Sequence, residues 1–287
     1  MKKLLFVSLI TIIICFAIVQ SIDESDIFDD IFTSEEIDFI KDNSISYDDI
    51  LPYMHYQKFN VLHFNDYERI RNNSTNYLEA VNTFHNFDYY TPYINKQKAV
   101  FIDTNYVLVN KHYYLDSSYI PKNLTNVSEY NINYIKRDNE VMMACKEALD
   151  NYKLMYEAAL KENINFIIFS AYRSYEKQEH LYFDVNLEND NFSARPGHSE
   201  HQTGLAFDIS TSTHGLTENF SLSLEYKWLK DNSYKFGFIE RFPKDKVDVT
   251  KYEYEPWHFR YVGKEIAAVI YNNSYTLEEY IIKHHEL

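Results

Sequence analysis

The sequence predicts an α+β fold, in which a small, mostly antiparallel sheet is flanked by helices and follows a small helical module. Two observations carry this prediction. Short apolar runs typical of buried strands appear only beyond about residue 96, where they alternate with helical patterns. Residues 22–95 instead show apolar side chains at helical spacing and contain no glycine. We therefore expect three segments: a leader over 1–21, a helical extension over 22–95 and a larger domain over 96–287.

The composition bounds the class of protein. The 287 residues are 45% hydrophobic, which is enough to bury a core in one large domain or two modest ones. Only 5 glycines are present, and no two of them are separated by a single residue, so a glycine-rich nucleotide loop is excluded. The formal net charge of -15 disfavours a nucleic-acid partner, which requires a basic surface.

The N-terminal segment is typical of a targeting signal. Lys2 and Lys3 precede an uncharged apolar stretch over residues 4–19, which as a helix would span about 24 Å. Because a hydrocarbon core is about 30 Å thick, this stretch is short for a membrane span. We expect residues 1–21 to be a cleaved secretory signal. An uncleaved signal anchor, which would attach the protein to a membrane, is the alternative.

The extension over 22–95 is acidic, and its pattern predicts short helices. One helix is expected to begin near Ser34, because apolar residues follow it at helical spacing. Further helical pieces over 47–53 and 67–84 are separated by prolines and polar residues. No residue of the extension has a catalytic spacing, so we expect it to act as a spacer or packing element.

The larger domain alternates strands and helices. A long helix is predicted over 137–162, where Ala144, Ala148 and Tyr152 recur at four-residue steps. The run over 164–170 is largely apolar, as expected of a buried strand. The other predicted strands cover residues 99–102, 106–109, 204–210, 236–240 and 257–262. The other predicted helices cover residues 174–182, 222–234, 264–272 and 277–284.

Cysteine chemistry is not expected in this protein. Of the 2 cysteines, Cys15 lies in the leader, so Cys145 has no partner for an intramolecular disulfide. Met142, Met143 and Leu149 share the predicted helical face of Cys145. That apolar setting indicates a buried thiol rather than a nucleophile.

Three residues have the types and the spacing of a metal site. His201 and Asp208 are separated by a segment in which Gly204 allows a turn. Side chains alternate along the strand that follows, so Asp208 faces away from the side on which Phe207 lies. His258, on another predicted strand, can supply a third ligand. Three nitrogen and oxygen ligands suit Zn²⁺ with one position left for water, which is the arrangement of catalytic zinc sites.

Two further residues suit hydrolysis at such a site. Glu255 precedes His258 by three residues and is not needed as a ligand, so it can act as a general base. Arg173 can stabilise an oxyanion or hold a substrate carboxylate. Each of these residues has an ordinary alternative when taken singly: a surface or core histidine, a turn carboxylate, or a surface ion pair.

Together, these segments resemble a known family. The stretch SARPGHSEHQTGLAFDIS over 193–210 closely resembles the signature of the D-alanyl-D-alanine carboxypeptidases of the vancomycin-resistance type. These enzymes belong to the zinc peptidase group that includes lysostaphin and the hedgehog signalling domain. YRSYEKQ over 172–178 matches the arginine segment of the family, and YEYEPWHFRYVG over 252–263 matches its third segment. With weaker similarity over 108–121, the resemblance covers residues 105–285.

The resemblance implies a role for each residue of the proposed metal site. His201, Asp208 and His258 would bind a single zinc ion. Glu255 would be the catalytic base. All ligand positions of the family motif are intact in this sequence, which favours an active enzyme over an inactive homologue.

The resemblance also implies a substrate-binding group. Arg173 would act on the substrate or the transition state, and Gln178 and Ser193 match positions expected to help hold the terminal carboxylate of the peptide. His198 lies close to these residues but is not a ligand in the family. The loop over 184–192 is shorter than in many relatives and would border the substrate.

The implied activity is that of an exported zinc carboxypeptidase acting on bacterial peptidoglycan. Such an enzyme would hydrolyse the terminal D-alanine of the stem peptides as a monomer, outside the cytoplasm, either secreted or anchored to the bacterial cell membrane. The same motifs occur in L,D-carboxypeptidases and in cross-bridge endopeptidases, which remain alternatives. A non-catalytic cell-wall binding protein is the alternative from another class.

Overall fold

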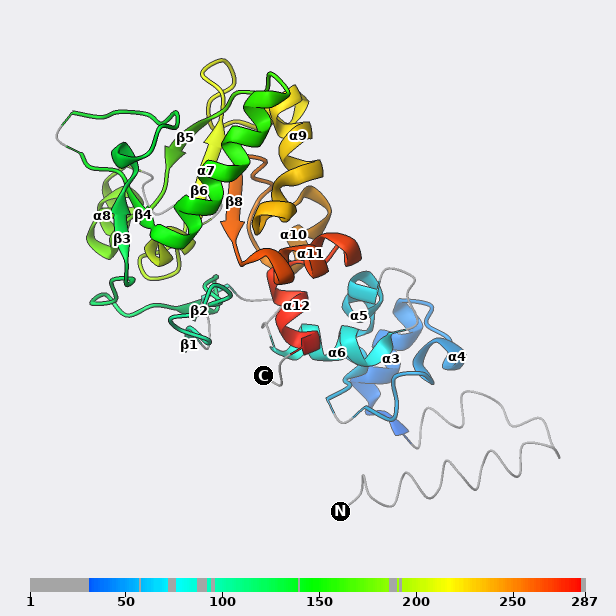
Figure 1. Cartoon of the computed structure of the whole chain (residues 1–287). Coiled ribbons are helices and arrows are strands. Elements are labelled where there is room, and N and C mark those ends of the chain that lie inside the picture. The colour runs from blue at the N-terminus through cyan, green and yellow to red at the C-terminus, as the bar shows by residue number, and fades with distance from the viewer. Residues whose placement is uncertain are drawn as a thin grey trace. The chain divides into compact units, whose positions relative to one another are not determined.

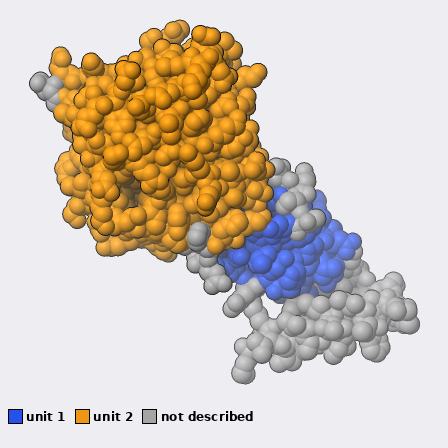
Figure 2. Space-filling view, viewed as in Figure 1, with its two compact units in different colours: residues 1–86 blue, residues 87–287 orange. Residues whose placement is uncertain are grey.

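We describe a computed structural model of the chain over residues 31–56, 58–71, 76–86, 92–93, 96–138, 140–185, 190 and 193–284. The predicted leader over 1–21 lies outside the described residues. The chain divides into two compact units, Met1–Asn86 and Phe87–Leu287, which Figure 2 distinguishes by colour. None of the helices among the described residues combines the length and apolarity that a membrane span requires.

The described part of the first unit is helical. Thr33 begins helix α3, because its side chain accepts a hydrogen bond from the Glu36 amide and the Glu36 carboxylate accepts one from the Thr33 amide. Tyr53 and Tyr67, both fully buried, lie 5.6 Å apart between ring centroids in its core. The helices are α3 (Ser34–Asp42), α4 (Tyr47–Ile50), η1 (Val61–His63), α5 (Phe64–Arg71) and α6 (Tyr77–Asn86).

A four-stranded antiparallel sheet lies at the centre of the second unit (Figure 1). Its strand order is β5 (Ile167–Ser170), β6 (Ala206–Ser210), β8 (His258–Tyr261) and β7 (Phe238–Glu240). Two smaller sheets pair β1 (Gln97–Lys98) with β2 (Tyr113–Tyr114), and β3 (Leu124–Asn126) with β4 (Met143–Cys145). The predicted α+β class is confirmed.

The helices of the second unit flank this sheet. They are α7 (Lys146–Lys161), α8 (Tyr175–His180), α9 (Leu224–Asn232), α10 (Val247–Thr250), α11 (Lys264–Asn273) and α12 (Leu277–His284). Short 3-10 or π turns lie between the strands and helices: η2 (Val127–Glu129), η3 (Leu181–Val185), η4 (Glu200–Thr203), η5 (Glu218–Leu222), η6 (Ser233–Phe236) and η7 (Lys244–Lys246).

The start of the long helix was predicted wrongly. Residues 143–145 form strand β4, and helix α7 begins only at Lys146. The reason is a local two-residue period: Met142 and Ala144 are buried while Val141 is exposed. Cys145 is therefore a strand residue rather than part of a helical face. Burial raises the pKa of its thiol to about 11, so it stays protonated, in keeping with the absence of a nucleophilic role.

The β-rich runs before this helix form less strand than expected. Within 99–109, Val100 and Leu108 make a single antiparallel bridge, and the regular pairing lies at β1 and β2 instead. The remaining predicted strands are observed, but each is shorter than predicted, because a strand extends only as far as its residues pair with a neighbouring strand.

The core lies between α7 and one face of the central sheet. Tyr152 of α7 stacks on Phe207 of β6 with ring centroids 5.5 Å apart, and both are fully buried. Phe207 is the register partner of Phe259 on β8. Because side chains alternate along a strand, the next pair, Asp208 and His258, faces the other side of the sheet. Packing against α7 on one face of the sheet therefore fixes the two strands that carry Asp208 and His258 on the other face.

Candidate metal centre

The three predicted ligands meet at one point. His201 comes from η4, Asp208 from β6 and His258 from β8, and their ligand atoms all lie within 4.8 Å of one another. Asp208 Oδ2 is 3.2 Å from His201 Nε2, and Asp208 Oδ1 is 3.2 Å from His258 Nδ1. All three side chains are almost completely buried. A single cation at this point would contact all three.

A short helical turn that ends at a glycine redirects the chain between His201 and Asp208. The Ser199 side chain accepts a hydrogen bond from the His201 amide and begins η4. Gly204 ends η4 in a left-handed conformation with φ of 69°. A Cβ atom there would lie 3.0 Å from Cys145 Sγ and 3.3 Å from the Cys145 amide nitrogen, so both the backbone angle and the space favour glycine. The chain then enters β6, which carries Asp208.

The two histidines present different nitrogens to the centre. His201 Nδ1 lies 2.6 Å from the carbonyl oxygen of Ala171, so it carries the proton and leaves Nε2 for a metal. His258 has the reverse arrangement, with Nδ1 toward Asp208 and Nε2 lying 3.3 Å from Oε2 of Glu200. Each ring therefore has an acceptor behind it, as metal-binding histidines ordinarily do.

The electrostatics of the centre favour a cation. Burial alone would lower the pKa of His258, but the Asp208 and Glu200 carboxylates outweigh it and raise this pKa to about 9. Burial likewise works against the Asp208 carboxylate, yet His201 and His258 hold its pKa well below the usual range. Two imidazole nitrogens and one carboxylate form a donor set that fits Zn²⁺.

Glu255 lies beside the ligands and outside the three-residue group. Its Oε2 is 3.6 Å from His258 Nδ1, and about a quarter of its side chain is exposed, at 24%. Burial raises the pKa of Glu255 to about 7, with Asp208 adding to the effect and His258 opposing it. A divalent cation at the neighbouring ligands would favour its ionised form. The carboxylate is thus placed to exchange a proton near neutral pH.

The predicted substrate group forms a hydrogen-bonded chain. Arg173 donates from Nη1 to Oε1 of Gln178 at 2.8 Å and from Nη2 to Oγ of Ser170 at 3.1 Å. Gln178 donates to Oγ of Ser193 at 3.1 Å and to the Ala194 carbonyl at 2.7 Å. Both ends of the Gln178 amide are therefore used within the protein. In this geometry Gln178 orients Arg173 and Ser193 and is not itself presented to a ligand.

The structure also places residues that sequence reasoning did not assign. Four buried charged side chains lie behind His258: Glu200, Arg241, Arg260 and Glu278. A signal was available, since Arg260 lies two residues from one predicted ligand on the same predicted strand and Glu200 adjoins another. His198 is separate from the centre: its Nδ1 faces the Asn110 carbonyl at 2.7 Å, and burial lowers its pKa to about 4.

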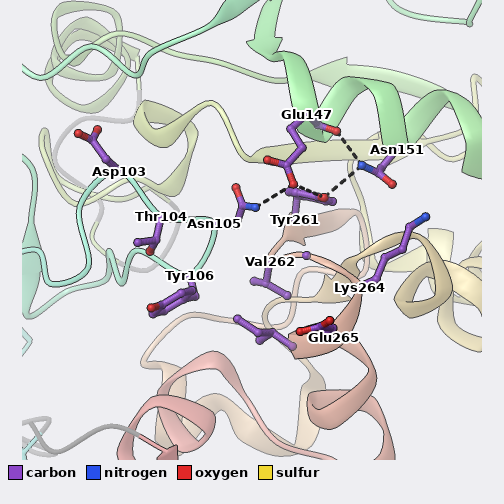
Figure 3. A pocket seen from close by; sticks show the side chains of 12 residues that line it. Asp103, Thr104, Asn105, Tyr106, Glu147, Asn151, Tyr261, Val262, Lys264 and Glu265 are labelled. Carbon is purple, nitrogen blue, oxygen red and sulfur yellow. Dashed lines mark hydrogen bonds between the residues drawn. The ribbon is translucent and has the colours of Figure 1, made fainter.

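Figure 3 shows a separate pocket, of about 710 Å³, whose lining includes Asn105, Glu147, Asn151 and Tyr261. Tyr261, one residue beyond Arg260, donates its hydroxyl to Oε1 of Glu147 at 2.8 Å, and Asn105 donates to the same oxygen at 3.0 Å. Asn151 donates to the Tyr261 hydroxyl at 3.1 Å. These four polar side chains are thus bonded to one another, and none of the three candidate ligands lines the pocket.

Comparisons with known proteins identify relatives of this chain. Residues 142–264 match the VanY family, described as D-alanyl-D-alanine carboxypeptidase. The protein YodJ of Bacillus subtilis (strain 168) is 45% identical over 183 residues, or 61% of this chain and 66% of that protein. This chain spans between 51% and 66% of the length of three curated relatives that it matches.

Two solved structures share the fold. The LdcB LD-carboxypeptidase, studied for peptidoglycan recognition, is 43% identical with a TM-score of 0.57, over 63% of this chain and 86% of that chain. VanYB in complex with D-alanine-D-alanine is 31% identical with a TM-score of 0.51, over 63% of this chain and 99% of that chain.

An antiparallel sheet that brings two histidines and an aspartate to one point, beside a glutamate outside that group, places the protein among the zinc metallopeptidases. The matched segment and the relatives identify the family within this class. The resemblance of the motifs to the D-alanyl-D-alanine carboxypeptidases is confirmed. The chain belongs to the VanY family of D-alanyl-D-alanine carboxypeptidases.

Proposed function

We propose that this chain is an exported, zinc-dependent carboxypeptidase that removes the terminal D-alanine from the peptide stems of peptidoglycan. One observation carries the proposal: His201, Asp208 and His258 converge within 4.8 Å while Glu255 lies 3.6 Å from His258 without joining them. This is the separation of roles that metal-assisted peptide hydrolysis needs. A relative bound to D-alanine-D-alanine supports the substrate.

The chain's own residues account for the proton transfers. When bound by the three ligands, zinc acts as a Lewis acid and brings the pKa of a coordinated water to about 7. Glu255 accepts the proton of the attacking water, since its carboxylate lies 3.6 Å from His258 Nδ1 and a cation at the neighbouring ligands would keep it ionised. The same carboxyl group then donates this proton to the departing amine of D-alanine.

Arg173 and Ser193 supply the polar contacts to the substrate. The Arg173 guanidinium is held from behind by Gln178 and Ser170, so its direction is fixed before any ligand arrives. It can donate to the developing oxyanion or to the terminal carboxylate of the peptide. Ser193 accepts a bond from Gln178, which leaves its own hydroxyl proton to donate to that carboxylate.

A second candidate activity is L,D-carboxypeptidase action on tetrapeptide stems. The observation that favours it is the 43% identity to the LdcB LD-carboxypeptidase, which exceeds the 31% identity to VanYB. Cleavage of cross-bridges would use the same residues.

A stem-peptide digest separates these activities. The zinc-loaded protein is incubated with pentapeptide stems ending in D-alanine-D-alanine, with tetrapeptide stems and with cross-linked dimers. The masses of the products are then measured by mass spectrometry. Loss of one alanine from the pentapeptide alone, abolished by a chelator, supports the proposal. Trimming of the tetrapeptide or cleavage of the dimer supports the alternatives. Intact peptides in all samples would favour a non-catalytic binding protein.

Replacing the proposed base tests the mechanism. Glu255→Ala should keep zinc at one ion per chain and lose hydrolysis by about 10²–10⁴-fold, because the ligands stay while proton transfer is removed. Zinc content is measured on the purified protein and turnover with the preferred stem. Glu253→Ala, an exposed neighbour in the same loop, is the matched control and should keep full activity. Full turnover in Glu255→Ala would contradict the mechanism.

We further propose that residues 1–21 direct the protein out of the bacterial cytoplasm and that the catalytic form is a monomer. Cell fractionation together with the mass of the isolated protein distinguishes a cleaved signal from a retained anchor. Light scattering on the purified protein measures the number of chains. Recovery from the cytoplasm alone would count against export.

A further inference from the structure

A closed group of charged side chains lies directly behind His258. It consists of Glu200, Arg241, Arg260 and Glu278, with two negative and two positive charges. Their side chains are 2% exposed for Glu200 and 0% for the other three. Such groups are costly to remove from water and are stable only when fully paired. The position of this group next to a metal ligand therefore calls for an explanation.

The two oxygens of Glu200 have different partners. Oε1 accepts from Nε of Arg241 and from Nη1 of Arg260, both at 2.7 Å. Oε2 lies 3.3 Å from Nε2 of His258. Both arginines are thus bonded to one oxygen, and the other oxygen is left for the histidine. With His258 Nδ1 toward the centre, its proton must lie on Nε2, where Oε2 accepts it.

Arg241 joins this carboxylate to the C-terminal helix. While Nε bonds Glu200, Nη1 and Nη2 bond the two oxygens of Glu278 on α12 at 2.8 and 2.6 Å. Asn110 donates to the same Glu278 carboxylate at 3.1 Å. The ring of Phe242, the next residue after Arg241, lies 4.8 Å from the His258 ring. The guanidinium therefore has no freedom to rotate away from Glu200.

Arg260 holds the other side of the group. Arg260 lies two residues beyond His258, on the same face of β8. Its Nη2 donates to the carbonyl of Val107 at 2.8 Å and to that of Asn105 at 3.1 Å. Both arginines are thus anchored away from Glu200 as well as to it. The carboxylate is held from two directions, and its remaining lone pairs point to the ligand.

We propose that Glu200 is a positioning residue for the metal ligand His258, and that Arg241, Arg260 and Glu278 fix it in place. Glu200 sets the ring orientation of His258 and keeps its proton on Nε2, so that Nδ1 is available to the ion. Through Glu278, helix α12 supports the metal site although none of its residues reaches the ion. The inference rests on the proposed function, because it assigns a role toward the zinc that this function requires.

Substitution of Glu200 by glutamine gives the main test. A glutamine side chain has an acceptor oxygen and a donor nitrogen, whereas Glu200 faces hydrogen-bond donors on both sides. Either orientation of the amide therefore sets a donor against a donor. We expect Glu200→Gln to weaken zinc binding about 10–100-fold, the usual effect of losing a partner of a ligating histidine. The dissociation constant is measured by competition with a chromophoric chelator.

The Co²⁺-substituted protein gives a second readout. The visible absorption of Co²⁺ reports the geometry of its ligands and should shift in Glu200→Gln. The matched control is Glu278→Gln, which removes the same charge from the same buried group but leaves the contact between Glu200 and His258. It should lower the unfolding midpoint, retain a zinc affinity within about threefold of the wild type, and keep the wild-type Co²⁺ spectrum.

A measurement on the wild type covers the case in which Glu200→Gln does not fold. In the zinc-loaded protein, long-range proton–nitrogen correlation should show His258 bound through Nδ1, with a slowly exchanging proton on Nε2. Absence of that proton, or a folded Glu200→Gln with wild-type zinc affinity and Co²⁺ spectrum, overturns the proposal. A wild type that binds zinc stoichiometrically but cleaves no stem overturns the proposed function alone.

Discussion

On one face of strands β6 and β8, Phe207 stacks on Tyr152 of α7, and Phe259 belongs to the same apolar core. On the other face, Asp208 and His258 face the candidate metal centre. All four side chains are almost completely buried. The first face is apolar and the second is ionic, although the residues alternate along the same two strands. The two faces therefore differ in the partners of their side chains and not in burial.

The two faces make different contributions to the protein. The apolar face stabilises the fold in proportion to the area it removes from water, whatever the details of its packing. Buried ion pairs contribute little net stability, because desolvation offsets their attraction, but they restrict the geometry strongly. We infer that the apolar face holds the strands together and the ionic face fixes the directions of the ligands. Substitutions on each face should therefore affect different properties.

The largest effect is expected on the ionic face. Asp208→Asn removes the charged ligand between His201 and His258 while keeping the side-chain volume. Loss of the metal removes several kcal/mol of transition-state stabilisation, so hydrolysis should fall by about 10³-fold or more. Zinc content should fall with it, while far-ultraviolet circular dichroism stays unchanged because the apolar face is intact.

Asp231→Asn, at an exposed position of α9, is the matched control and should alter neither zinc content nor turnover. Zinc is measured by atomic absorption after dialysis against metal-free buffer. Wild-type activity in Asp208→Asn would mean that the ionic face is not the catalytic face.

Much of the fold was predictable because it depends on local pattern. Alternation along 205–208 was enough to place Phe207 and Asp208 on opposite faces, and the observed strand does so. The start of α7 was missed because residues 141–145 fit both a helical and a two-residue period. Pairing with β3, a contact that local pattern does not contain, decides between them.

The site was predictable in part for the same reason. His201 and Asp208 lie in one short motif, and a second motif holds His258, so their residue types and spacing indicate the ligand set. The ionic group behind His258 was not predictable. Glu200 and Arg260 are 60 positions apart, and no sequence period connects them. Charged residues in apolar strands mark such groups, but only the structure shows which of them pair.

A smaller effect, and one on stability alone, is expected on the apolar face. Phe207→Ala removes a fully buried ring that stacks on Tyr152, and should lower the free energy of unfolding by about 3–5 kcal/mol. Phe207→Leu, which keeps most of the volume, should cost less than about 1.5 kcal/mol. Urea titration measures both. Zinc affinity of the folded fraction should stay at the wild-type value, and a loss beyond tenfold would show that the faces are not independent.

The smallest effect has the opposite sign. The Tyr152 hydroxyl is buried on the apolar face and has no hydrogen-bond partner among the described residues. Tyr152→Phe removes this unsatisfied group and keeps the ring, so the free energy of unfolding should rise by about 1 kcal/mol. Tyr156→Phe is the matched control on the same helix. Its hydroxyl donates to Oδ1 of Asn165 at 3.2 Å, so its removal should cost about 0.5–1.5 kcal/mol. Thermal and urea unfolding measure both, and a Tyr152→Phe protein less stable than the wild type would show that the apolar face also depends on a polar contact.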